Sequence, residues 1–359
     1  MHTYITCMGG NGNAELRACH LDCLTGQLQT LIATNTGVKS PLYADIDAQG
    51  RYMYVADHMP DCDGTLGGAI CAYQIEPDSG KLNYLNRRPS RGQTPCYIAV
   101  SADGRFVLTA NYSNGSVAVL PIGDGGLLGE AVTSVQHEGS SITDRQTGPH
   151  AHCFRFDPGN RFALAADLGT DRVAVYRFES DTGVLSPNEP THASTCPGAG
   201  PRHITFSADA RFAYVINELD NTITVMGYDN HKGVLDPQQT IPTLPKDFGG
   251  TSWASDIHLH PNGKFLYGTN RGDGAPSSIV IYAIDPTTGK LNLIGHESTQ
   301  GDFPRGFGID PTGRILVVAN QESDNVMTFT IDAQSGKLTA SGHSVKVPKP
   351  VCINFAEAP

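Results

Sequence analysis

A regularly spaced turn constrains this chain more than any other feature of its sequence. The turn ends in a cation and recurs every 50 to 56 residues, at Arg51, Arg105, Arg161, Arg211, Lys264 and Arg314. An Asp or Asn always follows six residues later, and apolar stretches such as 106–110 lie between them. The apolar residues alternate with a period of two, which indicates β-strands, whereas a helical repeat would show a period near 3.6.

A second pattern, Gly-x-Leu after a polar turn, occurs seven times. Its glycines are Gly26, Gly80, Gly126, Gly183, Gly233, Gly289 and Gly336. Strand-like stretches such as 173–176 precede the pattern, and a weaker strand follows it. Each unit therefore contains four strands, A to D, in about 50 residues, which is the spacing of a β-propeller blade.

The difference between six cation turns and seven Gly-x-Leu turns predicts how the ring closes. The chain opens on a B-like strand over residues 3–8 and ends on an A-like strand over residues 351–355. If these strands pair, the last blade is closed by both termini and no open sheet edge remains. We predict an all-β, seven-bladed β-propeller with four antiparallel strands per blade, as a single domain over residues 1–359.

Composition excludes several classes of partner. The net charge of −11 is diffuse, and the basic residues are not clustered, so we expect binding of neither nucleic acid nor a membrane. The chain starts without a basic and apolar leader, and its nine cysteines are scattered without a metal-binding spacing. We therefore expect a cytoplasmic protein with reduced thiols, as a monomer or a weak homo-oligomer.

Two positions of the repeat identify a candidate site. In a propeller, residues that start strand A and residues that end strand B surround one mouth of the central channel. The A position, nine residues before the cation, contains Leu42, Cys96, His152, Arg202, Ser255 and Arg305. The B position, seven residues after the cation, contains His58, Tyr112, Leu168, Glu218, Arg271 and Gln321. Because these positions diverge while the turn cations repeat, we expect function there.

The residues at the mouth favour an anionic ligand. Arg202, Arg271 and Arg305 would converge on one small volume, and guanidinium groups bind phosphate or carboxylate. Glu218 is the lone carboxylate at that level, with Asp256 as a second candidate next to the blade-five position. His152, with His150 two residues earlier, supplies a group that titrates near neutrality.

At these residues the chain resembles the lactonase family of seven-bladed propellers, which includes 6-phosphogluconolactonases and carboxymuconate-cyclising enzymes. The similarity covers essentially the whole chain, and the matching stretches are 148–152, 198–203, 215–219, 256–258, 269–272, 304–307 and 319–321. The resemblance implies a catalytic centre of His152, Arg202, Glu218 and Arg271, with Arg305 and Gln321 close by.

This resemblance suggests a carboxylic ester hydrolase that opens a sugar lactone, with 6-phosphogluconolactone of the pentose phosphate pathway as the favoured substrate. Either Glu218 or His152 would activate water, and Arg202 or Arg271 would stabilise the oxyanion. We expect the substrate-binding residues to be His150, Asp256, Arg305 and Gln321. No metal or cofactor is required by this scheme, and the arginines disfavour a cation at the same place.

Two alternatives remain from the sequence. A cyclase could close a lactone from a carboxymuconate-type diacid, because the same arginines would bind carboxylates. A non-enzymatic propeller could serve as an interaction scaffold, although scaffolds usually expose apolar or aromatic patches. Turnover of a phosphorylated gluconolactone compared with that of a carboxymuconate would distinguish the two enzymatic reactions.

Overall fold

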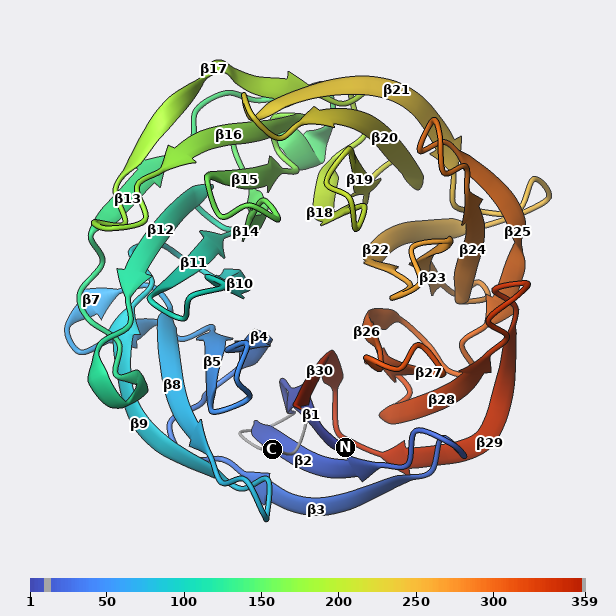
Figure 1. The fold of residues 1–359 in the computed structure, drawn as a ribbon, viewed down its shortest axis with the longest axis horizontal. Helices are drawn as coiled ribbons and strands as arrows, with labels where there is room; N and C mark the ends of the chain where they lie inside the picture. The colour runs from blue at the N-terminus through green and yellow to red at the C-terminus, as the bar shows by residue number, and fades with distance from the viewer. Residues whose placement is uncertain (10–13, 357–359) are drawn as a thin grey trace.

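The computed structural model describes residues 1–9 and 14–356, and within these ranges seven four-stranded antiparallel sheets form a closed ring (Figure 1). The predicted seven-bladed propeller is therefore confirmed. Figure 1 shows the A strands nearest the channel and the D strands on the outside of the ring. Among the described residues, no helix is long and apolar enough to cross a membrane.

The blades follow one another along the chain, and in each blade the strand named first lies nearest the channel. Blade 1 contains β4 (Pro41–Ile46), β5 (Tyr52–Asp57), β8 (Ala69–Ile75) and β9 (Leu82–Pro89). Blade 2 contains β10 (Pro95–Val100), β11 (Phe106–Asn111), β12 (Ser116–Pro121) and β13 (Thr133–Gln136). Blade 3 contains β14 (Ala151–Phe156), β15 (Phe162–Asp167), β16 (Arg172–Phe178) and β17 (Leu185–Ser194).

The remaining blades complete the ring. Blade 4 contains β18 (Pro201–Phe206), β19 (Phe212–Asn217), β20 (Thr222–Asp229) and β21 (Val234–Pro242). Blade 5 contains β22 (Thr251–Leu259), β23 (Phe265–Asp273), β24 (Ser278–Ile284) and β25 (Leu291–Ser298). Blade 6 contains β26 (Pro304–Ile309), β27 (Ile315–Asn320), β28 (Asn325–Ile331) and β29 (Leu338–Lys346). Blade 7 contains β30 (Pro350–Ala356), β1 (His2–Cys7), β2 (Glu15–Leu21) and β3 (Leu28–Thr34).

Four short elements of the described ranges lie outside the blade sheets. The strands β6 (Asp61–Cys62) and β7 (Thr65–Leu66) form a small ribbon in the loop between β5 and β8. Two single-turn 3₁₀ helices occur, η1 (Asp124–Gly126) and η2 (Asp144–Gln146). The second of these lies in the long connection from β13 to β14, which brings it to the face where the A strands begin.

The repeated turns have a simple local cause. In the A–B turn of blade 1, an oxygen of Asp47 accepts hydrogen bonds from the backbone N–H groups of Arg51 and Tyr52, at 2.6 and 2.8 Å. The cation side chain itself stays in solvent, since that of Arg51 is 63% exposed. In the C–D turns, all seven Gly-x-Leu glycines have φ between 67° and 79°, a conformation that only glycine adopts without strain.

The hydrophobic core lies between neighbouring blades. Phe265 and Tyr267 of blade 5, for example, pack in one buried cluster with Phe307, Leu316 and Phe329 of blade 6. Each sheet therefore buries both faces against its neighbours, and stability depends on an unbroken ring. Because the A strands are held on all sides, the residues at their starts occupy fixed positions around the channel.

The two termini close the ring as the repeat count predicted. β30 pairs antiparallel with β1, so that Ile353 lies opposite Ile5. On one side blade 7 packs Ile5 against Ile315 and Val317 of blade 6. On the other side Tyr4 belongs to a cluster with Met53 of blade 1. Most of the glycine-rich stretch at residues 9–12, which the sequence suggests is a B–C loop, lies outside the described residues.

Candidate active site

A β-bulge interrupts the innermost strand of every blade, and in blade 7 it leaves Val351 without a partner on β1. In blade 3, Ala151 pairs with Asp167 and Cys153 with Ala166, so His152 has no partner on β15. The same two-against-one arrangement occurs in blades 1, 2, 4, 5 and 6, at Leu42, Cys96, Arg202, Ser255 with Asp256, and Arg305. A bulge releases a residue from the ladder and changes the direction of its side chain. The bulges therefore explain why the diverging A positions surround the channel mouth.

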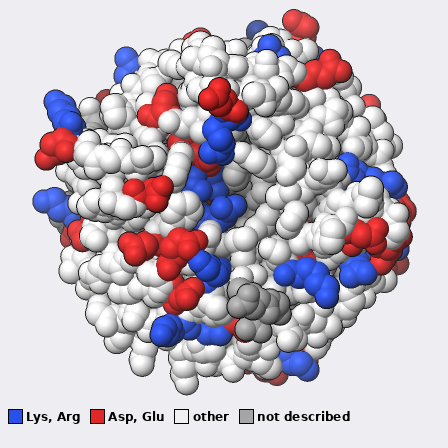
Figure 2. Space-filling view, turned by 180° about the vertical axis from the view of Figure 1, so that it is seen from behind, with Lys and Arg blue, Asp and Glu red and all other residues white. Residues whose placement is uncertain are grey.

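A cavity of about 340 Å³ opens at this mouth. It is lined by Leu42, Thr94, Cys96, Tyr112, Arg145, His152, Glu218, Trp253, Arg271, Phe303 and Arg305. Its volume suits a small molecule rather than a polymer. Lys and Arg atoms gather in the hollow at the centre of the face shown in Figure 2, next to several acidic atoms.

Glu218, which follows β19, organises the charges of the cavity. Its Oε2 lies 3.0 Å from Arg202 Nε and 2.7 Å from Arg271 Nη2. Its Oε1 lies 3.3 Å from Arg145 Nη2. Burial opposes ionisation of Glu218, but the charges of Arg271, Arg202 and Arg145 outweigh it and lower the pKa of the carboxyl to about 2. Glu218 is therefore ionised throughout the neutral range.

The cavity has more positive than negative charge. Arg145, Arg271 and Arg305 of the lining contribute three positive charges, and Glu218 contributes one negative charge, which leaves two positive charges in excess. Arg202, which pairs with Glu218 from outside the lining, adds a further positive charge nearby. Burial, together with the charge of Arg202, lowers the pKa of Arg305 to about 10. Within the described part of the chain, no hydrogen bond or ion pair engages the Arg305 guanidinium. An anionic ligand would supply the missing partner.

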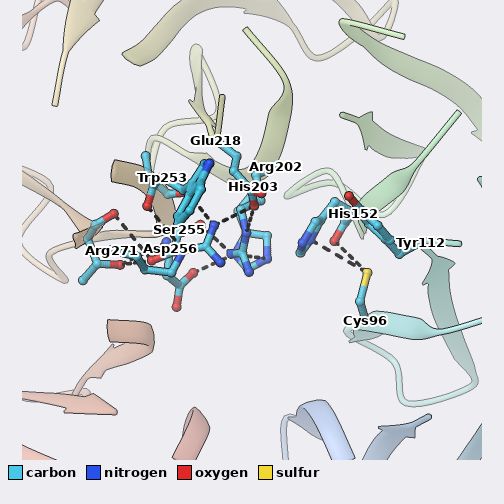
Figure 3. Close-up of polar contacts among 12 residues, drawn as sticks. Cys96, Tyr112, His152, Arg202, His203, Glu218, Trp253, Ser255, Asp256 and Arg271 are labelled. Atoms are coloured by element: carbon cyan, nitrogen blue, oxygen red, sulfur yellow. Dashed lines mark hydrogen bonds and ion pairs between the residues drawn. The ribbon is translucent and has the colours of Figure 1, made fainter. Parts of the chain in front are cut away.

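His152 lies opposite this cluster, beside Cys96 and Tyr112 (Figure 3). Its Nδ1 is 3.8 Å from Cys96 Sγ, and its ring meets that of Tyr112 edge to face at 5.4 Å. Burial and the charges of Arg202, His203 and Arg305 lower the pKa of His152 well below 6.5. The imidazole is therefore neutral at pH 7 and retains a lone pair that can accept a proton.

Aromatic rings form the wall beside Arg271. The Arg271 guanidinium lies over the Phe303 ring, with 5.1 Å from Cζ to the ring centroid. Its Nε also donates to the backbone oxygen of Trp253 at 3.3 Å. These contacts hold the guanidinium plane in place, and the rings reduce its contact with water, so its charge acts at short range with little screening.

Four predicted residues lie outside the cavity lining. Arg202 is 2% exposed and lies behind Glu218, where Nη1 donates to the Ser255 carbonyl at 2.6 Å. The His150 ring stacks on Tyr112 and its Nδ1 contacts the Tyr112 carbonyl at 2.9 Å. Gln321 donates to the adjacent Glu322 at 2.7 Å.

Asp256 lies deeper in the channel. Its carboxylate contacts His203 Nδ1 at 2.8 Å and His258 Nε2 at 3.1 Å, and it accepts a hydrogen bond from the Phe307 N–H at 3.1 Å. It thus links blades 4, 5 and 6 beneath the cavity. His203 in turn lies 3.2 Å from Arg202 Nη1, so this network supports the arginine from below.

Sequence reasoning missed Arg145, Trp253 and Phe303. Arg145 lies in η2, outside both repeated positions, and only the unusual length of the 137–150 connection could have drawn attention to it. Trp253 precedes the A position by two residues, and Phe303 lies just before β26. Their roles depend on how the loops fold over the mouth, which the spacing of the repeat does not encode.

Comparison with known proteins agrees with this geometry. The model of the family described as lactonase, 7-bladed beta-propeller, matches residues 2–355. The chain belongs to this lactonase family. It is 38% identical to a 6-phosphogluconolactonase of Bacillus subtilis over 316 residues, which cover 88% of the chain and 87% of the relative.

Other relatives bear related names. A 6-phosphogluconolactonase of Serratia proteamaculans is 33% identical, and the match covers 83% of the chain and 86% of the relative. Among solved structures, the periplasmic gluconolactonase of Pseudomonas aeruginosa superposes with a TM-score of 0.92 at 33% identity, covering 100% of this chain and 99% of that one. Proteins named for a phosphorylated and for an unphosphorylated lactone thus share this fold.

Proposed function

We propose that this lactonase-family chain hydrolyses a negatively charged sugar lactone in the mouth cavity, with 6-phosphogluconolactone as its substrate. The observation that carries the proposal is the Arg305 guanidinium, which lines the cavity without a protein partner among the described residues. The excess of two positive charges in the cavity lining, with Arg202 close behind it, supports an anion there, and relatives named 6-phosphogluconolactonase support a phosphorylated lactone.

In the proposed reaction, His152 acts as the general base. It takes a proton from a water molecule while the water oxygen attacks the lactone carbonyl. The carbonyl π electrons move onto its oxygen, and the resulting tetrahedral oxyanion collapses by breaking the ring C–O bond. The proton returns to the departing ring oxygen, so the products are a hydroxyl group and a carboxylic acid, which then ionises.

His152 is the better-supported base of the two that the sequence left open. Glu218 is a weaker candidate because the Arg271 and Arg202 charges lower the pKa of its carboxyl to about 2 and occupy its lone pairs. The neutral His152 ring lines the cavity and has no hydrogen bond to Nε2 in the described chain. Glu218 then acts as a positioning residue for the two guanidinium groups.

Arg271 is the better-supported oxyanion donor. It lines the cavity, and its contacts with Glu218 and Trp253 fix its orientation. Arg202, 2% exposed, supports Glu218 from behind. Donors fixed before the reaction stabilise the developing charge without reorganisation, and the loss of one typically costs about 10²- to 10³-fold in turnover.

The test is hydrolysis of 6-phosphogluconolactone, followed by acid release and corrected for the uncatalysed rate. We expect turnover by the wild-type chain and a loss of about 10²- to 10³-fold in kcat for Arg271→Ala. Arg211→Ala, which removes a 53% exposed turn cation paired with Asp209, is the matched control and should be fully active. Equal activity of all three proteins would overturn the assignment, and turnover of a carboxymuconate alone would favour the cyclase.

The location in the cell is also part of the proposal. The nine cysteines are free thiols, seven of them buried, which supports a reducing compartment such as the cytoplasm. A 33% identical relative is named a periplasmic gluconolactonase, so the fold also works outside the cytoplasm. Cell fractionation with antibody detection decides between the two compartments.

A further inference from the structure

Arg145 reaches the cavity from a rigidly held loop. The loop spans residues 137–150, whereas the corresponding connections before blades 2 and 6 span only residues 90–94 and 299–303. The side chain of Gln146 is buried and donates to the Leu168 carbonyl at 2.8 Å and to Asp171 Oδ1 at 2.7 Å. Thr143 and Gln146 also form a capping box that closes η2. The backbone of Arg145 is therefore fixed over the cavity mouth.

The Arg145 side chain is much less constrained than its backbone. It is 50% exposed, and its Nη2 contacts Tyr112 Oη at 2.9 Å and Glu218 Oε1 at 3.3 Å. Arg202 and Arg271 both approach the other oxygen of Glu218, and at shorter distances. Glu218 would remain paired if Arg145 moved away. Because Arg145 is half exposed, water screens its side of this 3.3 Å pair, and a phosphate with more negative charge can compete with Glu218 for its guanidinium group.

The cavity lining also contains Arg305, whose guanidinium group has no protein partner among the described residues. Arg145 and Arg305 line the same cavity, which the oxyanion donor Arg271 also lines. A phosphate group carries about two negative charges, which can pair with two guanidinium groups. Its three terminal oxygens can also accept hydrogen bonds from them. A neutral hydroxyl at the same place on the substrate could accept a hydrogen bond as Tyr112 Oη does, but it has no negative charge to replace that of Glu218 as the partner of Arg145.

We propose that Arg145 leaves Glu218 when substrate enters and binds the substrate phosphate together with Arg305. Arg145 thereby determines the preference of the site for phosphorylated over unphosphorylated lactones. The inference rests on the proposed lactone hydrolysis, and it assigns substrate discrimination to a loop residue that lies outside the repeated positions.

The experiment compares two substrates across matched variants. Arg145→Gln removes the charge, and Arg145→Lys keeps it without the planar fork. Arg91→Gln is the control, because Arg91 is a 43% exposed cation in the loop before blade 2, it pairs with Glu130, and it does not line the cavity. Each protein is assayed with 6-phosphogluconolactone and with gluconolactone, and binding of 6-phosphogluconate and gluconate is measured by calorimetry.

We expect Arg145→Gln to raise KM for the phosphorylated lactone by about 10- to 100-fold, because a hydrogen-bonded charge pair is lost. The kcat/KM for gluconolactone should change by less than about threefold, Arg145→Lys should recover part of the loss, and Arg91→Gln should match the wild type. Binding of 6-phosphogluconate should weaken by the same factor as KM increases, with gluconate unaffected.

Two other outcomes separate this inference from the proposed function. An equal loss on both lactones would mean that Arg145 acts through Glu218, which overturns the discrimination role while leaving lactone hydrolysis intact. If the wild type hydrolysed neither lactone but bound 6-phosphogluconate in an Arg145-dependent way, the phosphate assignment would stand and the proposed reaction would fall. Arg145-independent binding of 6-phosphogluconate overturns the inference in either case.

Discussion

Replacing Glu218 with Gln should destabilise the protein, although the two side chains have nearly the same shape. Glu218 is the shared counter-ion of Arg202 and Arg271, which are 2% and 5% exposed. The neutral amide would leave both guanidinium groups buried without a negative charge. Breaking a buried pair by removing one partner typically costs about 3–5 kcal/mol, since the other charge stays desolvated.

The pKa of Glu218 gives an independent estimate of how much its ionised carboxylate contributes to stability. A carboxyl whose pKa is lowered from 4.5 to about 2 contributes roughly 3 kcal/mol to the free energy of unfolding at pH 7. Because the folded-state value is the lower one, this contribution is complete above pH 4.5 and disappears as the pH falls through about 2. In acid the wild-type side chain is protonated and becomes equivalent to the Gln variant.

Urea denaturation of the wild type and Glu218→Gln, monitored by circular dichroism in buffer without multivalent anions, tests both the size of the destabilisation and its dependence on pH. We expect a difference of about 3 kcal/mol at pH 7 and less than half of that at pH 3. Glu130→Gln is the control, because Glu130 is 63% exposed and its pairs with Arg88 and Arg91 should contribute only about 0–1 kcal/mol. A difference below about 0.5 kcal/mol at pH 7, or one that does not change with pH, would refute the reasoning.

Three further predictions follow from the same structure. The acid limb of the kcat/KM profile should have its midpoint below pH 6.5, because burial and nearby arginines lower the pKa of His152; a midpoint at or above 6.5 would exclude it as the base. A chain that ends at Lys349 lacks β30, and burial of Val351 and Ile353 in that strand alone should contribute about 3–6 kcal/mol to the free energy of unfolding. The melting temperature of this variant should therefore fall well below that of the full chain, and a difference within about 2 °C would contradict ring closure by both termini. Gly169→Ala would place a Cβ 1.9 Å from the backbone oxygen of Gly148, in the loop before β14. The free energy of unfolding of this variant should fall by about 1–3 kcal/mol, and unchanged stability would show that the loop can move.

The fold could be read from the sequence because a propeller repeats its local geometry. The offset from cation to Asp or Asn reflects the length of one strand, and the Gly-x-Leu turn needs a positive φ in every blade. Both are short-range requirements that each blade meets in the same way. Counting six copies of one pattern against seven of the other was therefore enough to predict the pairing of β1 with β30.

The candidate site could be predicted from the sequence only in part. Spacing predicted that residues such as His152 and Arg305 start A strands near one mouth, and both line the cavity. It could not show that the His150 ring turns aside to stack on Tyr112, or that Gln321 bonds to its own neighbour. Those directions depend on which side chains stand nearby, and the repeat does not encode them.

Sequence alone thus determined the seven blades, their closure and the positions that surround the channel, since these depend on distances along the chain. The tertiary structure decided which charges meet. It brought Arg145 from a loop, Arg202 from blade 4 and Arg271 from blade 5 onto one carboxylate, Glu218, and left Arg305 without a partner in the described chain. Electrostatic interactions act through space over a few ångströms, so only the folded ring defines the balance of charge that favours an anionic substrate.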